Sequence, residues 1–138
     1  MSERQEPVRV RDVMKKHFDT VDGMDTVAEA LERMLHVDTK CLIVRKRHRD
    51  DELGMVLISD IARQVLAKDR APDRVNIYEI MSKPLLSVPP DMDIRYCARL
   101  FDRFDLSRAP VVENGEVIGI VSLTDLVIKG MLPRLPRP

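Results

Sequence analysis

GIVSLTDL at residues 119–126 and GMVLISDI at residues 54–61 carry one pattern twice. Each copy begins with glycine and continues through apolar residues that favour a β-strand. Each then reaches serine, threonine or aspartate, which favour the start of a helix. The copies lie 65 positions apart, and self-similarity at such a spacing indicates an internal repeat.

The flanking segments repeat as well. Val13-Met14 and Ile80-Met81 are 67 positions apart, and so are Asp25-Thr26-Val27 and Met92-Asp93-Ile94. The offsets differ because the loop before residue 54 is three residues longer than the loop before residue 119, and we expect the second half to gain one residue near Leu106.

The first half predicts a strand over residues 17–21 and then an amphipathic helix capped by Asp25 or Thr26. Two apolar strands follow over 41–44 and 53–58, joined by a charged loop. A last helix begins at Ser59 or Asp60 and runs to about residue 68. The apolar face of the first helix is expected at Val27, Ala30, Leu31, Met34 and Leu35, with helical spacing.

The second half predicts the same order of elements. A strand spans 85–88, and a helix presents Ile94, Cys97, Ala98 and Phe101. A hairpin of 110–112 and 117–121 turns at Asn114-Gly115, a strong signal for a two-residue turn. Ser122 or Thr124 caps the last helix. The order strand, helix, strand, strand, helix therefore occurs twice, which predicts an α+β fold.

The chain divides into a tail (1–7), a first repeat (8–69), a linker (70–76), a second repeat (77–130) and a disordered tail (131–138). Ala71-Pro72-Asp73 separates the repeats, and prolines end the last helix. A half of about 60 residues buries little surface alone, so we expect the two repeats to pack together with pseudo-twofold symmetry.

Composition excludes several kinds of function. The 138 residues hold 23 basic and 23 acidic residues, so a nucleic-acid partner is not expected. The basic run 45–49 is followed at once by acidic 50–52, which indicates a solvated hairpin loop. We expect no membrane span, no signal peptide and a reducing cytoplasm, because the two cysteines form no disulfide framework.

The repeated pattern, with Asp12-Val13-Met14, Glu79-Ile80-Met81 and 109–112 as supporting segments, resembles the CBS domain. Two in tandem resemble a CBS pair, or Bateman module, here of the stand-alone bacterial or archaeal type, over residues 8–130. The resemblance implies a regulatory module for signal transduction that binds an adenine nucleotide between the repeats: AMP, ADP, ATP, NAD or S-adenosylmethionine. It also implies a homodimer that signals to an unidentified effector protein, since the repeats leave no room for an output domain. No other cofactor is implied.

The resemblance assigns a ribose-binding role to Asp125 and a polar-partner role to Ser122. A carboxylate can accept hydrogen bonds from both ribose hydroxyls, and a helix N-terminus suits a phosphate. Asp60 would bind ribose in a second site, where Leu57 replaces the serine and one hydroxyl is lost. The base would be held from the other repeat, largely by backbone. For the Asp125 site these residues are Thr20, Val21, Thr39, Lys40 and Cys41. For the Asp60 site they are Ser87, Val88, Ser107, Arg108 and Ala109, with Pro110 fixing the strand entry.

Lys40 and Arg108 are expected at matching positions, where each could meet a phosphate. Simpler interpretations stay open. Asp60 and Asp125 could be capping acids, Ser122 a plain N-cap, and the two cations solvated charges. The module would then be structural, mediating dimerisation with no nucleotide. Histidines 17, 36 and 48 show no metal-ligand spacing, no nucleophile motif occurs, and we expect no enzyme and no metal.

Overall fold

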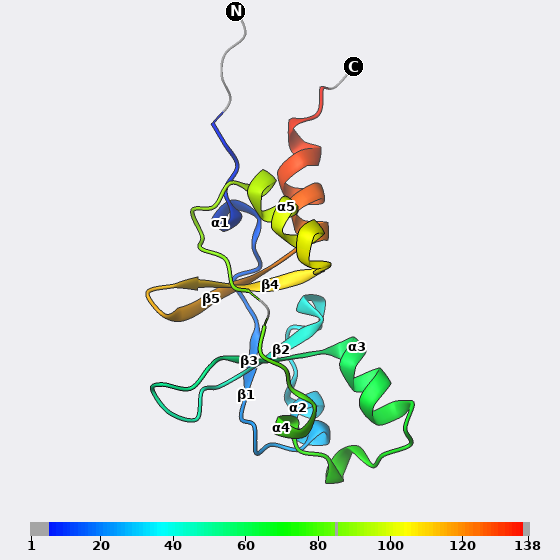
Figure 1. Cartoon of the computed structure of the whole chain (residues 1–138). Coiled ribbons are helices and arrows are strands. Elements are labelled where there is room, and N and C mark those ends of the chain that lie inside the picture. Colours follow the sequence, from blue (N-terminus) through cyan, green and yellow to red (C-terminus); the bar gives the residue numbers. More distant parts are fainter. Residues whose placement is uncertain (1–5, 85, 137–138) are drawn as a thin grey trace, which may run out of the picture. The chain divides into compact units, whose positions relative to one another are not determined.

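The computed structural model describes residues 6–84 and 86–136. They form two compact units (Figure 1). Unit 1 combines the chain up to Lys16 with the chain from residue 85 onward, and unit 2 runs from His17 to Pro84. Helices and strands are mixed in both units, so the α+β prediction is confirmed.

Unit 2 is a three-stranded sheet with short helices. Strand β2 lies in the centre, parallel to β1 and antiparallel to β3. The elements are β1 (Asp19–Val21), α2 (Val27–Arg33), η1 (Val37–Thr39), β2 (Cys41–Val44), β3 (Gly54–Leu57), α3 (Ile58–Ile61), η2 (Ala62–Leu66), η3 (Pro72–Arg74) and α4 (Ile77–Ile80). Its core contains Leu42, Val44 and Val56 of the sheet, packed against helical residues such as Val27.

Unit 1 repeats this plan around an antiparallel hairpin. Strands β4 and β5 pair with each other, and a single parallel bridge from Val88 to Val111 stands where β1 pairs with β2 in unit 2. The elements are α1 (Val10–Val13), α5 (Ile94–Phe104), β4 (Arg108–Glu113), β5 (Glu116–Ser122), α6 (Leu123–Asp125), η4 (Leu126–Met131) and η5 (Leu132–Arg134). Phe101 of α5 is fully buried in this core, beside Val111 and Val121.

Each unit takes its leading helix from the start of the other repeat: α1, at the start of the first repeat, packs in the core of unit 1, and α4, at the start of the second, packs in the core of unit 2. In unit 1, Val10 N–H donates to the Met92 carbonyl at 2.8 Å, while Lys15 and Ile120 exchange two backbone hydrogen bonds of 2.8 and 2.9 Å. In unit 2, Ile77 N–H donates to the Asp25 carbonyl at 2.8 Å, and Ser82 and Met55 make the equivalent exchange. The residues that make equivalent hydrogen bonds in the two units therefore lie 67 or 65 positions apart, as the copies of the repeated sequence pattern do.

A glycine lies at the point where each leading segment meets the sheet. A Cβ on Gly119 would lie 2.6 Å from the Lys15 carbonyl oxygen and 2.8 Å from the Met14 sulfur. A Cβ on Gly54, the equivalent residue, would lie 3.0 Å from the Met81 sulfur. These distances explain why both copies of the pattern begin with glycine.

Most predicted elements form, and several of them begin or end at other residues than predicted. The first helix ends at Arg33, so Leu35 is 81% exposed instead of lying on its apolar face. Thr26, not Asp25, caps that helix, because its hydroxyl accepts the Glu29 N–H. The N-cap of α3 is Leu57, not Ser59 or Asp60.

The second half also agrees in part. Ser122 caps α6, and Asn114 and Gly115 both have positive φ, as the predicted turn requires. Of the predicted strand 85–88, residue 85 lies outside the described residues and Val88 makes the bridge noted above. The helical turns run on through Arg134, further than the tail expected from residue 131, because proline is tolerated in a first helical turn. Residues 137 and 138 lie outside the description.

Candidate functional site

Asp125 lies at the third position of α6, immediately after the buried strand β5. The Ser122 hydroxyl accepts the Asp125 N–H at 3.2 Å and donates to Asp125 Oδ2 at 2.9 Å. The Ser122 N–H also donates to Oδ2 at 3.3 Å, which completes a capping box. The predicted Ser122 and Asp125 pair therefore exists, and its local role is to begin a helix.

Two lysines surround the same carboxylate. Lys15 Nζ lies 2.7 Å from Asp125 Oδ1 and 2.9 Å from Oδ2, so it bridges both oxygens. Lys129, one helical turn after Asp125, lies 3.3 Å from Oδ1. Asp125 is only 3% exposed, and the Lys15 side chain is 20% exposed. The result is a nearly buried carboxylate with two cations and one hydroxyl.

The pKa of Asp125 reflects opposing effects. Burial alone would raise it, because desolvation disfavours the charged form. Hydrogen bonds from Lys15 and Ser122, with the charges of Lys15 and Lys129, outweigh burial and hold the pKa below its ordinary value. The carboxylate is therefore ionised at neutral pH and can act as an acceptor for hydroxyl donors.

Asp60 occupies the equivalent position in α3, with a simpler environment. Its Oδ2 accepts the Leu57 N–H at 3.0 Å, and the residue is only half-buried. Ser82 stands in the place of Lys15 and Gln64 in the place of Lys129. Within residues 6–84 and 86–136, no ion pair involves Asp60.

The strand register corrects the expected match between Lys40 and Arg108. Cys41 pairs with Leu57 and Arg108 pairs with Ser122, so Arg108 corresponds to Cys41. Lys40 corresponds to Ser107, since their carbonyls accept the N–H groups of Ile58 and Leu123. The extra residue expected near Leu106 is absent, and the two cations lie one position apart in register.

The other predicted residues of unit 2 fall into two groups. Thr39 is buried, and its hydroxyl donates to the His36 carbonyl at 2.8 Å and to the Cys41 carbonyl at 3.2 Å. The intervening Lys40 is exposed, in a left-handed conformation with φ of 59°. Cys41 is fully buried. The Thr39 hydroxyl therefore bonds to nearby backbone, and Cys41 belongs to the buried core.

Thr20 and Val21 line a small pocket of about 180 Å³ in unit 2. The other lining residues are Asp19, Asp25, Ala30, Arg33, Met34 and Arg45. Arg33 contacts Glu29 at 3.2 Å, and both Asp19 oxygens accept backbone N–H groups, from Leu35 and His36. The pocket thus places Thr20 and Val21 beside two arginines that the sequence interpretation had not included.

The remaining predicted residues belong to unit 1. Val88 exchanges backbone hydrogen bonds with Pro110 and Val112, each at 3.0 Å, and Ser87 before it is exposed. Ser107 is exposed, while Ala109 and Pro110 are buried in β4. Arg108 is half-buried beside Ser122 in the register of the hairpin, so Ser107, Arg108, Ser122 and Asp125 gather at one end of β4 and β5.

Lys15 is the functional candidate that sequence reasoning missed. It stands one residue after Met14, in a segment used only to support the repeat. The available signal was the repeat itself, because Lys15 corresponds to Ser82 and is charged in one copy alone. Its contact with Asp125, 110 residues away, depends on the leading helix packing in unit 1.

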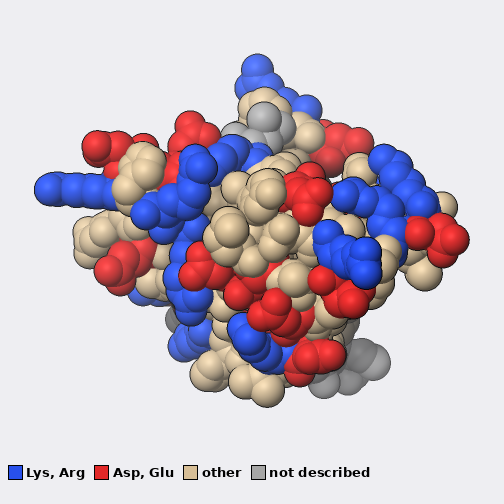
Figure 2. Space-filling model, turned by 90° about the horizontal axis from the view of Figure 1, so that it is seen from below, with Lys and Arg blue, Asp and Glu red and all other residues tan. Residues whose placement is uncertain are grey.

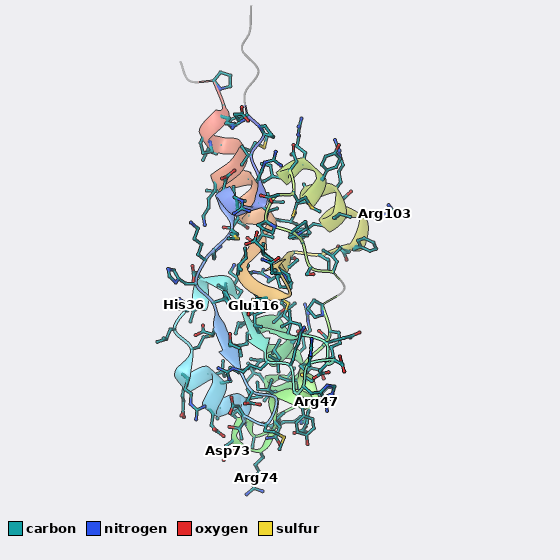
Figure 3. The ribbon with its side chains drawn as sticks, turned by 90° about the vertical axis from the view of Figure 1, so that its left-hand side faces the viewer. His36, Arg47, Asp73, Arg74, Arg103 and Glu116 are labelled. Atoms are coloured by element: carbon teal, nitrogen blue, oxygen red, sulfur yellow. The ribbon has the colours of Figure 1, made fainter. Side chains whose placement is uncertain are left out.

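Other candidate chemistry is sparse in the described part of the chain. His17 and His36 stack with ring centroids 5.5 Å apart (Figure 3 labels His36), yet no described cluster of three metal-binding side chains occurs. Burial raises the pKa of the Cys97 thiol to about 11. No described helix is long and apolar enough to cross a membrane. The charged loop after β2 is held by an Arg47–Asp51 contact of 3.2 Å. On the face shown in Figure 2, acidic and basic side chains are interspersed.

Comparison with known proteins shows the same module elsewhere. A protein of Methanocaldococcus jannaschii is 26% identical over 116 residues, 83% of this chain and 62% of its own length. The CBS domain-containing protein YhcV of Bacillus subtilis is 29% identical over 122 residues, 88% of this chain and 85% of its own. The chain spans about six-tenths of the length of the archaeal relatives it matches.

A solved structure agrees closely in fold. The hexameric CBS-CP12 protein from bloom-forming cyanobacteria is 33% identical, with a TM-score of 0.85 over 96% of this chain and 78% of that one. The CBS domain family matches residues 10–67 and again residues 77–130. These two matches coincide with the two copies of the pattern that ends in Asp60 and Asp125. The chain therefore belongs to the CBS domain family and carries a tandem CBS pair.

Proposed function

We propose that this chain is a regulatory module that binds an adenine nucleotide at Asp125 and at Asp60 and signals its occupancy to a partner protein. CBS pairs are generally regulatory modules for adenosine ligands. The observation that carries the proposal is the recurrence of an aspartate at the third helical position after the last strand of each repeat. A carboxylate there can accept both hydroxyls of a ribose.

Nearby cations support a phosphorylated ligand. Arg108 lies at the same end of the hairpin as Asp125, and Lys129 follows Asp125 by one turn. Lys40, directly before β2, is exposed near the start of α3 in unit 2. Arginine can bind a phosphate through two parallel hydrogen bonds, whereas lysine acts as a point charge. AMP, ADP, ATP and NAD carry such phosphates, while S-adenosylmethionine has none and is a candidate through its ribose alone.

A structural module is the second candidate, and two observations favour it. The capping box explains Ser122 and Asp125 without any ligand. The helical turns after β5 also leave large apolar side chains exposed, which suits a protein contact. These are Leu123, Val127, Ile128, Met131 and Leu132. We propose that they contribute to a homodimer. A reducing, cytoplasmic setting is in keeping with the two free cysteines.

Ligand-dependent thermal unfolding separates the two candidates. A nucleotide present at 100 times its Kd stabilises the native state by about 2.7 kcal/mol, which raises Tm by several degrees in a domain of this size. We expect a rise with at least one of AMP, ADP, ATP, NAD and S-adenosylmethionine, and none in the double variant Asp60→Ala/Asp125→Asn. If all five leave the wild-type Tm unchanged at millimolar concentration, the structural candidate is favoured, and light scattering then tests the dimer.

A further inference from the structure

The Asp125 carboxylate already accepts hydrogen bonds at both of its oxygens. Lys15 Nζ bridges Oδ1 at 2.7 Å and Oδ2 at 2.9 Å, and the Ser122 hydroxyl donates to Oδ2 at 2.9 Å. With Lys129 at 3.3 Å, the carboxylate is 3% exposed. A ribose must present two hydroxyls to the two oxygens that Lys15 bridges. The ammonium group that bridges both oxygens competes with those hydroxyls for the same acceptors.

The backbone of Lys15 is held by hydrogen bonds, while its side chain is held only at its ammonium group. Lys15 N–H donates to the Ile120 carbonyl, and the Lys15 carbonyl accepts the Ile120 N–H. The long side chain then reaches Asp125 with 20% of its surface exposed. Rotation about its side-chain bonds would free both oxygens without moving α1 or β5.

Unit 2 has no such obstacle. Ser82 makes the same two backbone hydrogen bonds, to Met55, but its short side chain carries no charge. The Asp60 carboxylate is half-buried and accepts the backbone N–H of Leu57. The lost hydroxyl at Leu57 weakens this site, yet the site needs no cation to be displaced.

We propose that Lys15 is a latch on the Asp125 site: its ammonium group occupies the ribose position, and a ligand binds there only by displacing it. The proposal rests on the proposed function and concerns its regulation. The two sites then fill in order, the Asp60 site at lower ligand concentration and the Asp125 site at higher concentration. One chain thereby responds over a wider range of ligand concentration than two equal sites would allow.

Adenosine is the probe of choice, because it has a ribose but no phosphate that Lys15 could attract. Binding is measured by calorimetry in an Asp60→Ala background, which leaves the Asp125 site alone. Lys15→Met, which keeps the length of the side chain and removes its charge, is expected to tighten adenosine binding about tenfold, since a charged hydrogen bond no longer competes. The matched control Lys16→Met, which removes the exposed cation next to Lys15 in the sequence, is expected to change Kd less than threefold.

The converse variant installs the latch in the other unit. In an Asp125→Asn background, Ser82→Lys is expected to weaken adenosine binding at the Asp60 site, again about tenfold. Ser82→Met is its control, because it adds length without charge, and it is expected to leave Kd within threefold. If Ser82→Lys binds as tightly as its control, the latch is overturned.

The outcomes separate the two proposals. If the Asp60→Ala protein binds adenosine and Lys15→Met binds it no more tightly, the latch is wrong and the proposed function stands. If Lys15→Met weakens ATP binding and leaves adenosine unchanged, Lys15 is a phosphate contact and the latch is again wrong. If neither background, with or without Lys15, binds adenosine or any of the five nucleotides, the proposed function fails and the latch fails with it.

A measurement on the wild-type lysines does not depend on how well the variants fold. Reductive methylation followed by mass spectrometry reports how available each amine is. We expect Lys15 to react slowly without ligand and at least fivefold faster with saturating adenosine, while the exposed Lys46 reacts at the same rate with and without ligand. A Lys15 rate that is unchanged by bound ligand contradicts the displacement.

Discussion

Asp125 and Asp60 occupy the same place in two copies of one fold, yet their surroundings differ in every respect except the backbone. Asp125 is nearly buried and holds Lys15, Lys129 and Ser122, whereas Asp60 is half-buried and accepts one backbone N–H. The single hydrogen bond from the Leu57 N–H to Asp60 is enough for a carboxylate that only begins a helix. The additional partners of Asp125 thus add a function, either in stability or in binding, that its counterpart lacks.

The largest difference is expected from removing each carboxylate. Asp125→Ala leaves Lys15 and Ser122 without their partner in a site with little water, so we expect a loss of about 3 kcal/mol in the free energy of unfolding. Asp60→Ala removes one helix-capping contact and should cost about 0.5–1 kcal/mol. Urea denaturation of both variants measures the two losses. Equal losses would show that the Asp125 cluster adds nothing to stability.

Thiol labelling shows which unit loses stability in the Asp125→Ala variant. Cys97 is fully buried in unit 1, and Cys41 is fully buried in unit 2. Each thiol reacts only when its surroundings open, and the Cys97 thiol has a pKa of about 11 because of burial. Asp125→Ala should accelerate labelling of Cys97 more than labelling of Cys41.

The two matched glycines should give a smaller contrast. A methyl group at residue 119 would press against the backbone carbonyl of Lys15, which cannot move without breaking the hydrogen bonds to Ile120. We expect Gly119→Ala to cost about 2 kcal/mol and Gly54→Ala about 1 kcal/mol. At residue 54 the nearest atoms, the Met81 sulfur and Val44 Cβ, would both lie 3.0 Å away, and the Met81 side chain can shift. Thermal unfolding of both variants measures the contrast, and a larger loss at residue 54 would contradict it.

The smallest expected effect is a dependence of stability on acid. The folded pKa of Asp125 lies below its ordinary value of about 3.9, so the folded state binds the proton less tightly than the unfolded state. The contribution is complete above about pH 4 and is lost as pH falls through the folded pKa. Urea unfolding at several pH values from 7 to 3 should therefore show Asp125→Asn approaching the wild type in stability as pH falls. A difference that stays constant over this range would argue against the ion pair.

The repeat, the order of elements and the paired aspartates could all be predicted from sequence, because glycine, apolar runs and capping residues act locally. Ser122 as the cap and Asn114-Gly115 as the turn are confirmed for the same reason. The exchange of leading helices could not be predicted, since it depends on packing between segments about 80 residues apart. Lys15 was missed as a consequence.

The register of Lys40 and Arg108 shows a second limit. In the sequence, a shift of one residue between the two repeats leaves the apolar strands looking alike. Only the hydrogen-bond register of the strands decides which residues correspond. The sequence alignment matched Lys40 with Arg108 because a cation was expected beside a phosphate in each site, and this match is wrong. The strands place Lys40 with Ser107 and Arg108 with Cys41, so the two sites differ in the position of their cations as well as in their serine.

The exchanged leading helices also set the order in which the chain can fold. Unit 2 is one continuous segment from His17 to Pro84, whereas unit 1 joins the chain before residue 17 to the chain after residue 84. During synthesis, unit 2 can complete its sheet before β5 has been made, so the segment before His17 has no partner in unit 1 until later. Closing unit 1 demands contacts across more than 100 residues, such as Lys15 to Asp125, and such distant contacts form slowly. Residues 6–16 should therefore be the last part of the described chain to gain protection from hydrogen exchange.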